Sequence, residues 1–335
     1  MKRRHFFTLL AVVWALSLHA DEQAPTSDRD RCILGFLETG ADSLTLGEMR
    51  ERCTQAPNQA EHGEEMSSVQ YRLMAERKAA SRPFSILAHR PNYVLFGAYN
   101  FEGWDPSLQQ EVSDDPNYQN DDIEMQFQFS FKVPLAIDLF EDRMDLFFGY
   151  TNRSFWQSYN SENSEPFRET NHEPELWAQF RNDWRVLGFT NAVNTFGWIH
   201  QSNGQTEPLS RSWNRLYANF ILERNDLVLS IKPWAWIAKD RATNDNPDIE
   251  DFMGHGEVRG AWQRNGHVFS VMLRNWLESG FDYGAAELSW SFPVFDYPFL
   301  KGYLQYFYGY GESLIDYNNK VNRIGLGISV TDWLD

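Results

Sequence analysis

The chain has 335 residues, a net charge of −17, 16% aromatic residues and a mean hydropathy of −0.54. The negative mean hydropathy excludes a polytopic helical membrane protein, and the acidic charge without any basic cluster argues against a nucleic-acid partner. A chain that is polar on average yet rich in aromatics is typical of a transmembrane β-barrel, whose strands alternate lipid-facing and interior side chains.

The N-terminus has the pattern of a secretory signal peptide. Lys2, Arg3 and Arg4 precede an apolar stretch at residues 6–18, which is too short to make a stable membrane anchor. The alternative is an uncleaved anchor helix. We interpret residues 1–20 as a signal peptide cleaved after Ala20, so the rest of the chain is exported.

Residues 21–82 are polar and charged, with helix-like stretches at 32–38, 44–52 and 65–78. This pattern indicates a small N-terminal periplasmic segment. The only two cysteines, Cys32 and Cys53, lie in it, and in an oxidising compartment we expect them to form a structural disulfide. Such a loop would stabilise the fold by roughly 3 kcal/mol on the chain-entropy model.

Residues 83–335 form the predicted barrel domain, because from residue 92 onward the hydrophobic pattern has a period of two. An even number of strands is expected of a closed bacterial barrel. The sequence therefore predicts an all-β, closed, antiparallel transmembrane barrel of about twelve strands. The candidate strands cover residues 93–101, 123–131, 144–159, 175–184, 187–199, 213–223, 227–237, 252–262, 268–276, 284–292, 299–310 and 322–333.

The connections between these strands alternate in length. Residues 224–226 and 264–266 form tight turns, whereas residues 104–121 and 239–251 form long polar loops. Short periplasmic turns and long external loops are typical of an outer-membrane barrel, and aromatics gathered near strand ends suit its interfacial girdles. A soluble barrel remains the alternative, because each strand's own signal is weak.

The richest candidate for chemistry is the stretch from Trp198 to Gly204, which contains His200 and Ser202. At the end of a strand these two residues project from the same face, with ~7 Å between their Cα atoms. A hydroxyl beside an imidazole meets the minimal requirement for a base-activated nucleophile. Alone, the same spacing is also found at an ordinary solvated strand edge.

Asn214 is the candidate third member of this group. It follows a polar connection and begins the next antiparallel strand, which would bring it opposite His200. Its side-chain oxygen would accept the imidazole Nδ1–H and fix the useful tautomer. A neutral amide suits a wall facing lipid, where a carboxylate would carry a large desolvation penalty.

The neighbouring stretch at 168–174 contains a further histidine, His172. We interpret this stretch as a structural connection from a loop into a strand rather than as a metal site. Arg168 and Glu169 are expected to pair inside the lumen, because polar networks fill the interior of small barrels.

Together these residues resemble the outer-membrane phospholipase A family. The stretches that carry the resemblance are 149–157, 166–174, 200–204, 210–217, 245–248 and 309–318, and the likeness extends from about Tyr93 to Asp332. The resemblance implies a twelve-stranded barrel with its active site on the lipid-facing wall near the extracellular rim. Ser202 would be the nucleophile, His200 the general base and Asn214 the residue that orients His200.

The resemblance also implies calcium dependence and a homodimer. Its calcium ligands correspond to Ser210, the backbone carbonyl of Gln205, Asp245, and Ser164 contributed by the partner subunit. Calcium prefers such oxygen ligands, and the backbone N–H of Gly204 or of Ser202 would add a donor for the oxyanion.

Two departures from the family pattern concern these same regions. Asn152 stands where family members often carry Gln on the dimer-facing wall, and the calcium-loop positions Gln205 and Glu207 are altered. Because Asn is shorter than Gln, dimer stability is the property this substitution puts in question. A change at position 205 is tolerable if that residue supplies only its backbone carbonyl.

The predicted function is calcium-dependent hydrolysis of the sn-1 and sn-2 acyl esters of phospholipids and lysophospholipids. The expected location is the outer membrane of a Gram-negative bacterium, with the active site toward the extracellular leaflet. The alternative is a non-enzymatic barrel, either a small porin or a structural protein in which the three residues lie together by coincidence.

Overall fold

The computed structural model describes residues 67–334 except residues 83, 238–244, 296 and 298. The predicted signal peptide and the predicted pairing of Cys32 with Cys53 lie outside the described residues. The chain divides into two compact units, and Ser67–Arg181 with Ala192–Asp335 make up the larger one. In the smaller unit, the described residues include β6 (Arg185–Val186), which pairs with Phe189 and Thr190.

Twelve long strands form the sheet, each close to a predicted one. They are β2 (Asn92–Asn100), β3 (Ile123–Asp138), β4 (Met144–Trp156), β5 (Phe167–Arg181), β7 (Phe189–Ser202), β8 (Ser212–Arg224), β9 (Leu227–Trp236), β10 (Gly256–Arg264), β11 (His267–Arg274), β12 (Ala285–Pro293), β13 (Lys301–Gly309) and β14 (Val321–Thr331).

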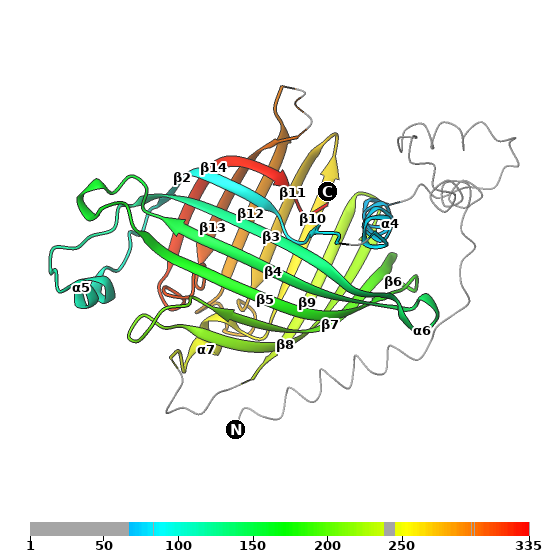
Figure 1. The fold of residues 1–335 in the computed structure, drawn as a ribbon, viewed down its shortest axis with the longest axis horizontal. Helices are drawn as coiled ribbons and strands as arrows, with labels where there is room; N and C mark the ends of the chain where they lie inside the picture. Colours follow the sequence, from blue (N-terminus) through cyan, green and yellow to red (C-terminus); the bar gives the residue numbers. More distant parts are fainter. Residues whose placement is uncertain (1–66, 83, 238–244, 296, 298, 335) are drawn as a thin grey trace, which may run out of the picture. The chain divides into compact units, whose positions relative to one another are not determined.

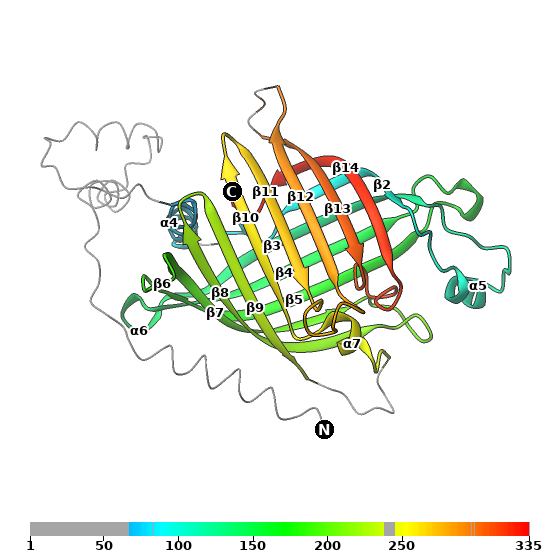
Figure 2. The same cartoon turned by 180° about the vertical axis from the view of Figure 1, so that it is seen from behind.

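The sheet closes on itself (Figures 1 and 2). Going round from β3, each strand pairs with its neighbour in the order β2, β14, β13 and so on down to β7, β5 and β4, and β4 pairs back with β3. The two-residue strand β1 (Leu87–Ala88) adds to β3. The predicted closed, antiparallel, twelve-stranded barrel is confirmed.

The barrel wall has an apolar outer face and a polar interior. On β7, Phe196 and Trp198 are 48% and 40% exposed, whereas Ile199, the next residue along the strand, is 1% exposed. Buried charged side chains line the inside; they include Glu124, Lys132, Arg168, Glu173, Glu175, Arg215, Glu287 and Arg323. Charged residues inside and large apolar residues outside reverse the arrangement of a soluble protein and suit a wall surrounded by lipid.

Most strand boundaries differ from the prediction by one to three residues, and three differ by more. β3 ends at Asp138 rather than at residue 131. β5 begins at Phe167, eight residues before the predicted start at 175, because the polar residues at 168, 169, 171 and 173 face the filled interior and made a strand look like a loop. Phe252 was expected to open a strand but lies in helix α7 (Ile249–Met253), and β10 starts at Gly256.

Helix α4 (Ser68–Ala80) lies at the end of the barrel that carries α6 (Leu139–Asp142), the connection from β3 to β4 (Figure 1). It begins with a capping box formed by Ser67 and Gln70. Glu76 pairs with Lys132 on β3 at 2.7 Å. Burial alone would raise the pKa of Glu76, and the cations of Lys132 and Arg72 lower that pKa to about 2, so the helix is tied to the wall by a charged pair.

No helix among the described residues is both long enough and apolar enough to cross a bilayer.

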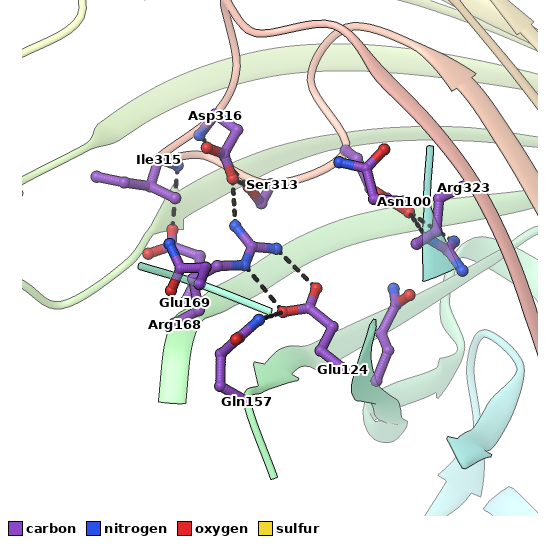
Figure 3. A network of polar contacts seen from close by, with 12 residues as sticks. Asn100, Glu124, Gln157, Arg168, Glu169, Ser313, Ile315, Asp316 and Arg323 are labelled. Carbon is purple, nitrogen blue, oxygen red and sulfur yellow. Dashed lines mark hydrogen bonds and ion pairs between the residues drawn. The ribbon is translucent and has the colours of Figure 1, made fainter. Parts of the chain in front are cut away.

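A buried polar network fills the barrel near its opposite end (Figure 3). Arg168 on β5 donates to Glu124 on β3 at 2.8 Å and pairs with Asp316 in the β13–β14 connection. Its guanidinium also lies 3.6 Å from the ring centroid of Trp104. Arg168 and Glu169 are both buried at the register shift between β4 and β5, but they do not form the predicted ion pair, because Arg168 pairs with carboxylates on other elements.

The two ends of the barrel carry different connections. At one end the chain turns tightly, with Asn225 and Asn265 at positive φ in the β8–β9 and β10–β11 hairpins. At the other end the connections are longer and contain α5 (Ser107–Ser113), the 3-10 helix η1 (Ser161–Asn163) and α7. His200 and Ser202 are at the last positions of β7, so the candidate site lies at the end with the long connections.

Candidate functional site

His200 and Ser202 lie on the outer face of the barrel wall. They continue the alternation of the exposed Phe196 and Trp198 along β7, while Ile199 points inward. The imidazole of His200 stacks on Trp198, with ring centroids 6.3 Å apart and an interplanar angle of 19°. The strand geometry thus places both residues on one face, as the sequence predicted.

Asn214 on β8 fixes the orientation of His200. Its Oδ1 lies 3.0 Å from His200 Nδ1, and Leu216, two residues further along the same face, is 54% exposed. An amide oxygen only accepts, so Nδ1 carries the proton and Nε2 is left with a lone pair. The Ser202 hydroxyl makes no side-chain hydrogen bond within residues 67–334 as described, and such bonds are often long before substrate binds.

Asn203, directly after Ser202, organises the loop that connects β7 to β8. Its buried side chain donates to the Leu209 carbonyl at 2.8 Å and to Glu169 at 3.3 Å. Its Oδ1 accepts from the backbone N–H groups of Arg211 and Gln205 at 3.0 and 3.3 Å. One amide therefore fixes both ends of the loop to the wall beneath it.

The loop that carries Gln205 and Ser210 would lose four hydrogen bonds if Asn203 were replaced by alanine, so we expect any calcium bound through these two residues to bind about tenfold more weakly. Calorimetric titration of calcium into the detergent-solubilised variant would measure the change. Heat-modifiable gel mobility, a property of intact barrels, serves as the check on folding. An unchanged affinity in a folded variant would contradict the role of Asn203 in holding this loop.

Several oxygen atoms gather beside this loop. The Ser210 hydroxyl donates to Asp245 Oδ2 at 2.6 Å, and the Gln205 carbonyl accepts no hydrogen bond from the described part of the chain. Hydroxyl, carboxylate and carbonyl oxygens are the ligands that calcium takes, so these residues fit a calcium ion. Among the described residues, no group of three or more His, Cys, Asp or Glu side chains is placed to hold a metal ion.

Ser164 lies in a different connection from Gln205, Ser210 and Asp245. It follows η1 in the β4–β5 connection, is exposed, and adopts a left-handed φ of 62°. In the described structure it makes no hydrogen bond to Gln205, Ser210 or Asp245.

His172 belongs to the site, although the sequence interpretation assigned it a structural role. It lies on the outer face of β5 and pairs in register with Ser202 on β7. Extending the period-two pattern backward from the exposed Leu176 would have placed His172 on that face. The polar residues that alternate with it concealed the strand.

The fold and the site place the chain among outer-membrane β-barrels that carry a serine, a histidine and an amide together on the outer wall. The family model described as phospholipase A1 matches residues 69–330. The chain belongs to the phospholipase A1 family and is a phospholipase enzyme.

Among similar proteins of known name, phospholipase A1 of Escherichia coli K12 is 37% identical over 251 residues, which cover 75% of this chain and 83% of that protein. Phospholipase A1 of Klebsiella pneumoniae is 36% identical over 253 residues, covering 75% of this chain and 84% of the relative. Both relatives are thus matched over most of their length.

Solved structures of outer-membrane phospholipases also resemble this chain. The Salmonella typhi outer-membrane phospholipase, a dimer with bound calcium, matches with a TM-score of 0.68 and 35% identity over 75% of this chain and 94% of that one. Outer-membrane phospholipase A from Escherichia coli matches with a TM-score of 0.68 and 34% identity over 75% of this chain and all of that one. An active-site mutant of the Escherichia coli enzyme, with an asparagine replaced by alanine, matches equally well, covering 76% of this chain and 94% of that one.

Proposed function

We propose that this phospholipase cleaves sn-1 and sn-2 acyl esters of phospholipids and lysophospholipids with Ser202 as nucleophile, His200 as general base and Asn214 as the residue that orients His200. The observation that carries the proposal is the 3.0 Å contact between His200 Nδ1 and Asn214 Oδ1 on the apolar outer wall, with Ser202 two residues along the same face. An asparagine is also an active-site residue in the Escherichia coli relative.

In the first half of the reaction, Ser202 Oγ attacks the ester carbonyl carbon while His200 Nε2 takes the hydroxyl proton. The imidazolium that forms keeps its Nδ1–H hydrogen bond to Asn214, so the positive charge develops on a ring already held in place. His200 then gives the proton to the departing alcohol oxygen of the lysolipid. The fatty acyl group is left esterified to Ser202.

In the second half, water attacks the acyl-enzyme and His200 acts again as base, so that fatty acid is released and the serine is regenerated. Gly204 has a φ of 67°, and its backbone N–H has no acceptor within the described structure, so it is available to the oxyanion. Gln205, Ser210 and Asp245 would hold a calcium ion, which would supply positive charge beside the oxyanion.

The proposed active form is a homodimer, since Ser164 makes no hydrogen bond to the other proposed calcium ligands within the described part of its own chain and a related enzyme is solved as a dimer with calcium. Asn152 on the outer face of β4 would lie in the subunit contact. We propose further that residues 1–20 are the signal peptide, that residues 21–82 are a periplasmic segment with a Cys32–Cys53 disulfide, and that the site faces the extracellular leaflet.

The test is release of fatty acid by the full-length purified protein in mixed micelles, with phospholipid labelled separately in the two acyl chains. Labelled fatty acid should be released from both positions in the presence of calcium. Calcium titrations of the free protein and of a covalently cross-linked dimer should show tighter binding in the dimer. Absence of release from any lipid at saturating calcium would refute the proposal.

The porin alternative is addressed by the interior of the barrel. Charged side chains inside the barrel form ion pairs, such as Arg215 with Glu173 at 3.0 Å and Arg259 with Glu287 at 3.2 Å, and they line a cavity of about 320 Å³. Residues so tied together obstruct an aqueous channel. Steady single-channel conductance in planar bilayers would favour the alternative.

A further inference from the structure

His172 lies in the centre of a row of outer-wall residues that crosses three strands. In register it pairs with Asn152 on β4 and with Ser202 on β7. Residues directly opposite on neighbouring strands have Cβ atoms about 4.5–5.5 Å apart and project to the same side. The imidazole is therefore adjacent to the nucleophile, on the side of Ser202 that faces away from β8 and Asn214.

The neighbours of His172 determine which ring nitrogen carries its proton. The Tyr150 hydroxyl lies 2.7 Å from Nδ1, and Asn152 Nδ2 lies 3.5 Å from the same atom. The Ser154 hydroxyl donates to Asn152 Oδ1 at 3.0 Å, which turns the amide nitrogen toward the imidazole. An amide nitrogen only donates, so Nδ1 is the acceptor and the neutral ring carries its proton on Nε2.

The edge of the ring that carries Nε2 faces the loop after Ser202. A Cβ atom placed on Gly204 would lie 3.8 Å from His172 Cδ2 and 3.9 Å from Nε2. Nε2 has no hydrogen-bond acceptor in the described part of the chain, and neither does the N–H of Gly204. Two donors without acceptors in the described structure thus lie near each other beside the nucleophile, and donors so placed suit a developing negative charge.

We propose that His172 is a further catalytic residue, whose Nε2–H donates to the carbonyl oxygen of the bound ester as that oxygen becomes an oxyanion. The inference rests on the proposed function of Ser202. When Ser202 Oγ bonds to the carbonyl carbon, the π pair moves to the oxygen and the serine proton passes to His200. His172 keeps its own proton and stabilises the new charge together with the N–H of Gly204.

The two histidines have different proposed roles because their Nδ1 atoms have different hydrogen-bond partners. His200 has its Nδ1 proton held by Asn214, so its Nε2 accepts a proton. His172 has its Nδ1 occupied as an acceptor, so its Nε2 donates. The two rings lie on different strands beside Ser202. The Nε2 atom of His200 accepts a proton, and the Nε2–H group of His172 donates a hydrogen bond.

The experiment compares His172→Phe and His172→Gln with wild type in mixed micelles at saturating calcium. Loss of one oxyanion donor typically costs about 10²–10³ in kcat, so we expect kcat of His172→Phe to fall about a hundredfold while KM changes only a few-fold. His172→Gln keeps an N–H donor at similar reach and should recover part of that loss. The amide of His172→Asn is too short to reach the ester carbonyl oxygen, so kcat of this variant should resemble that of His172→Phe. It supplies the same test if the phenylalanine variant does not fold.

His267→Phe is the matched control, because His267 is a histidine on the outer wall of β11 at the end of the barrel with the short turns. Its kcat should equal that of wild type. Cross-linking should show the same dimer fraction for the His172 variants as for wild type. A wild-type kcat in folded His172→Phe, or a fall that follows loss of the dimer, would overturn the inference while leaving Ser202 as nucleophile. Hydrolysis by Ser202→Ala would instead refute the proposed function itself.

Discussion

Replacing Ser202 by alanine is expected to lower the rate of fatty acid release about 10⁴-fold or more. Removal of the nucleophile leaves no atom to form the acyl-enzyme, and the rate that remains comes only from binding and the oxyanion donors. Ser202 is only partly buried and makes no side-chain hydrogen bond in the described structure, so its loss should not disturb the barrel. The measurement is a continuous assay of fatty acid release at saturating calcium.

Ser107→Ala provides the comparison, since Ser107 is an exposed serine at the start of α5 in another connection. It should retain the wild-type rate. Both variants should show unaltered heat-modifiable mobility. Substantial hydrolysis by a folded Ser202→Ala protein would mean that another residue attacks the ester.

Removal of calcium is expected to have the second largest effect. Chelation should stop hydrolysis, and added calcium should restore it, because the site would lose the positive charge beside the forming oxyanion. Asp245→Asn should retain activity but raise the calcium concentration for half-maximal rate by about tenfold or more, since it removes the carboxylate charge of a site with few charged ligands. Rates measured across a calcium series for each protein would give the shift.

Asp251→Asn is the control for this experiment. Asp251 is an exposed carboxylate of α7, six residues beyond Asp245 in the same connection. Its calcium response should match wild type, whereas a general electrostatic effect of the loop would shift both variants alike. Full activity in the presence of excess chelator would exclude a role for calcium.

The barrel could be predicted well from the sequence because the patterns that mark its strands and turns each involve only a few neighbouring residues. Period-two alternation marks a strand wherever one face meets lipid, and turns such as Asn265-Gly266 mark where strands end. The same alternation placed His200 and Ser202 on one face. Asn214 followed from the antiparallel order of neighbouring strands, and its contact with His200 has the geometry that was expected.

What the sequence concealed depends on contacts between distant segments. The start of β5 was missed because its inward residues are charged, and their partners, such as Glu124 and Asp316 for Arg168, lie on other elements. His172 was therefore read as part of a loop. Its place beside Ser202 follows only from the register of β5 against β7, and register is set by the whole closed sheet rather than by either strand alone.

The outer-wall location of Ser202 has a consequence for kinetics. The residues that line the interior cavity do not include Ser202, His200 or Asn214, so we expect substrate to reach Ser202 from outside the barrel. Lipid would arrive by sliding sideways within the bilayer plane. The velocity should then follow the mole fraction of phospholipid at the membrane surface, and diluting that surface with inert detergent should slow the enzyme even when the bulk lipid concentration is held constant.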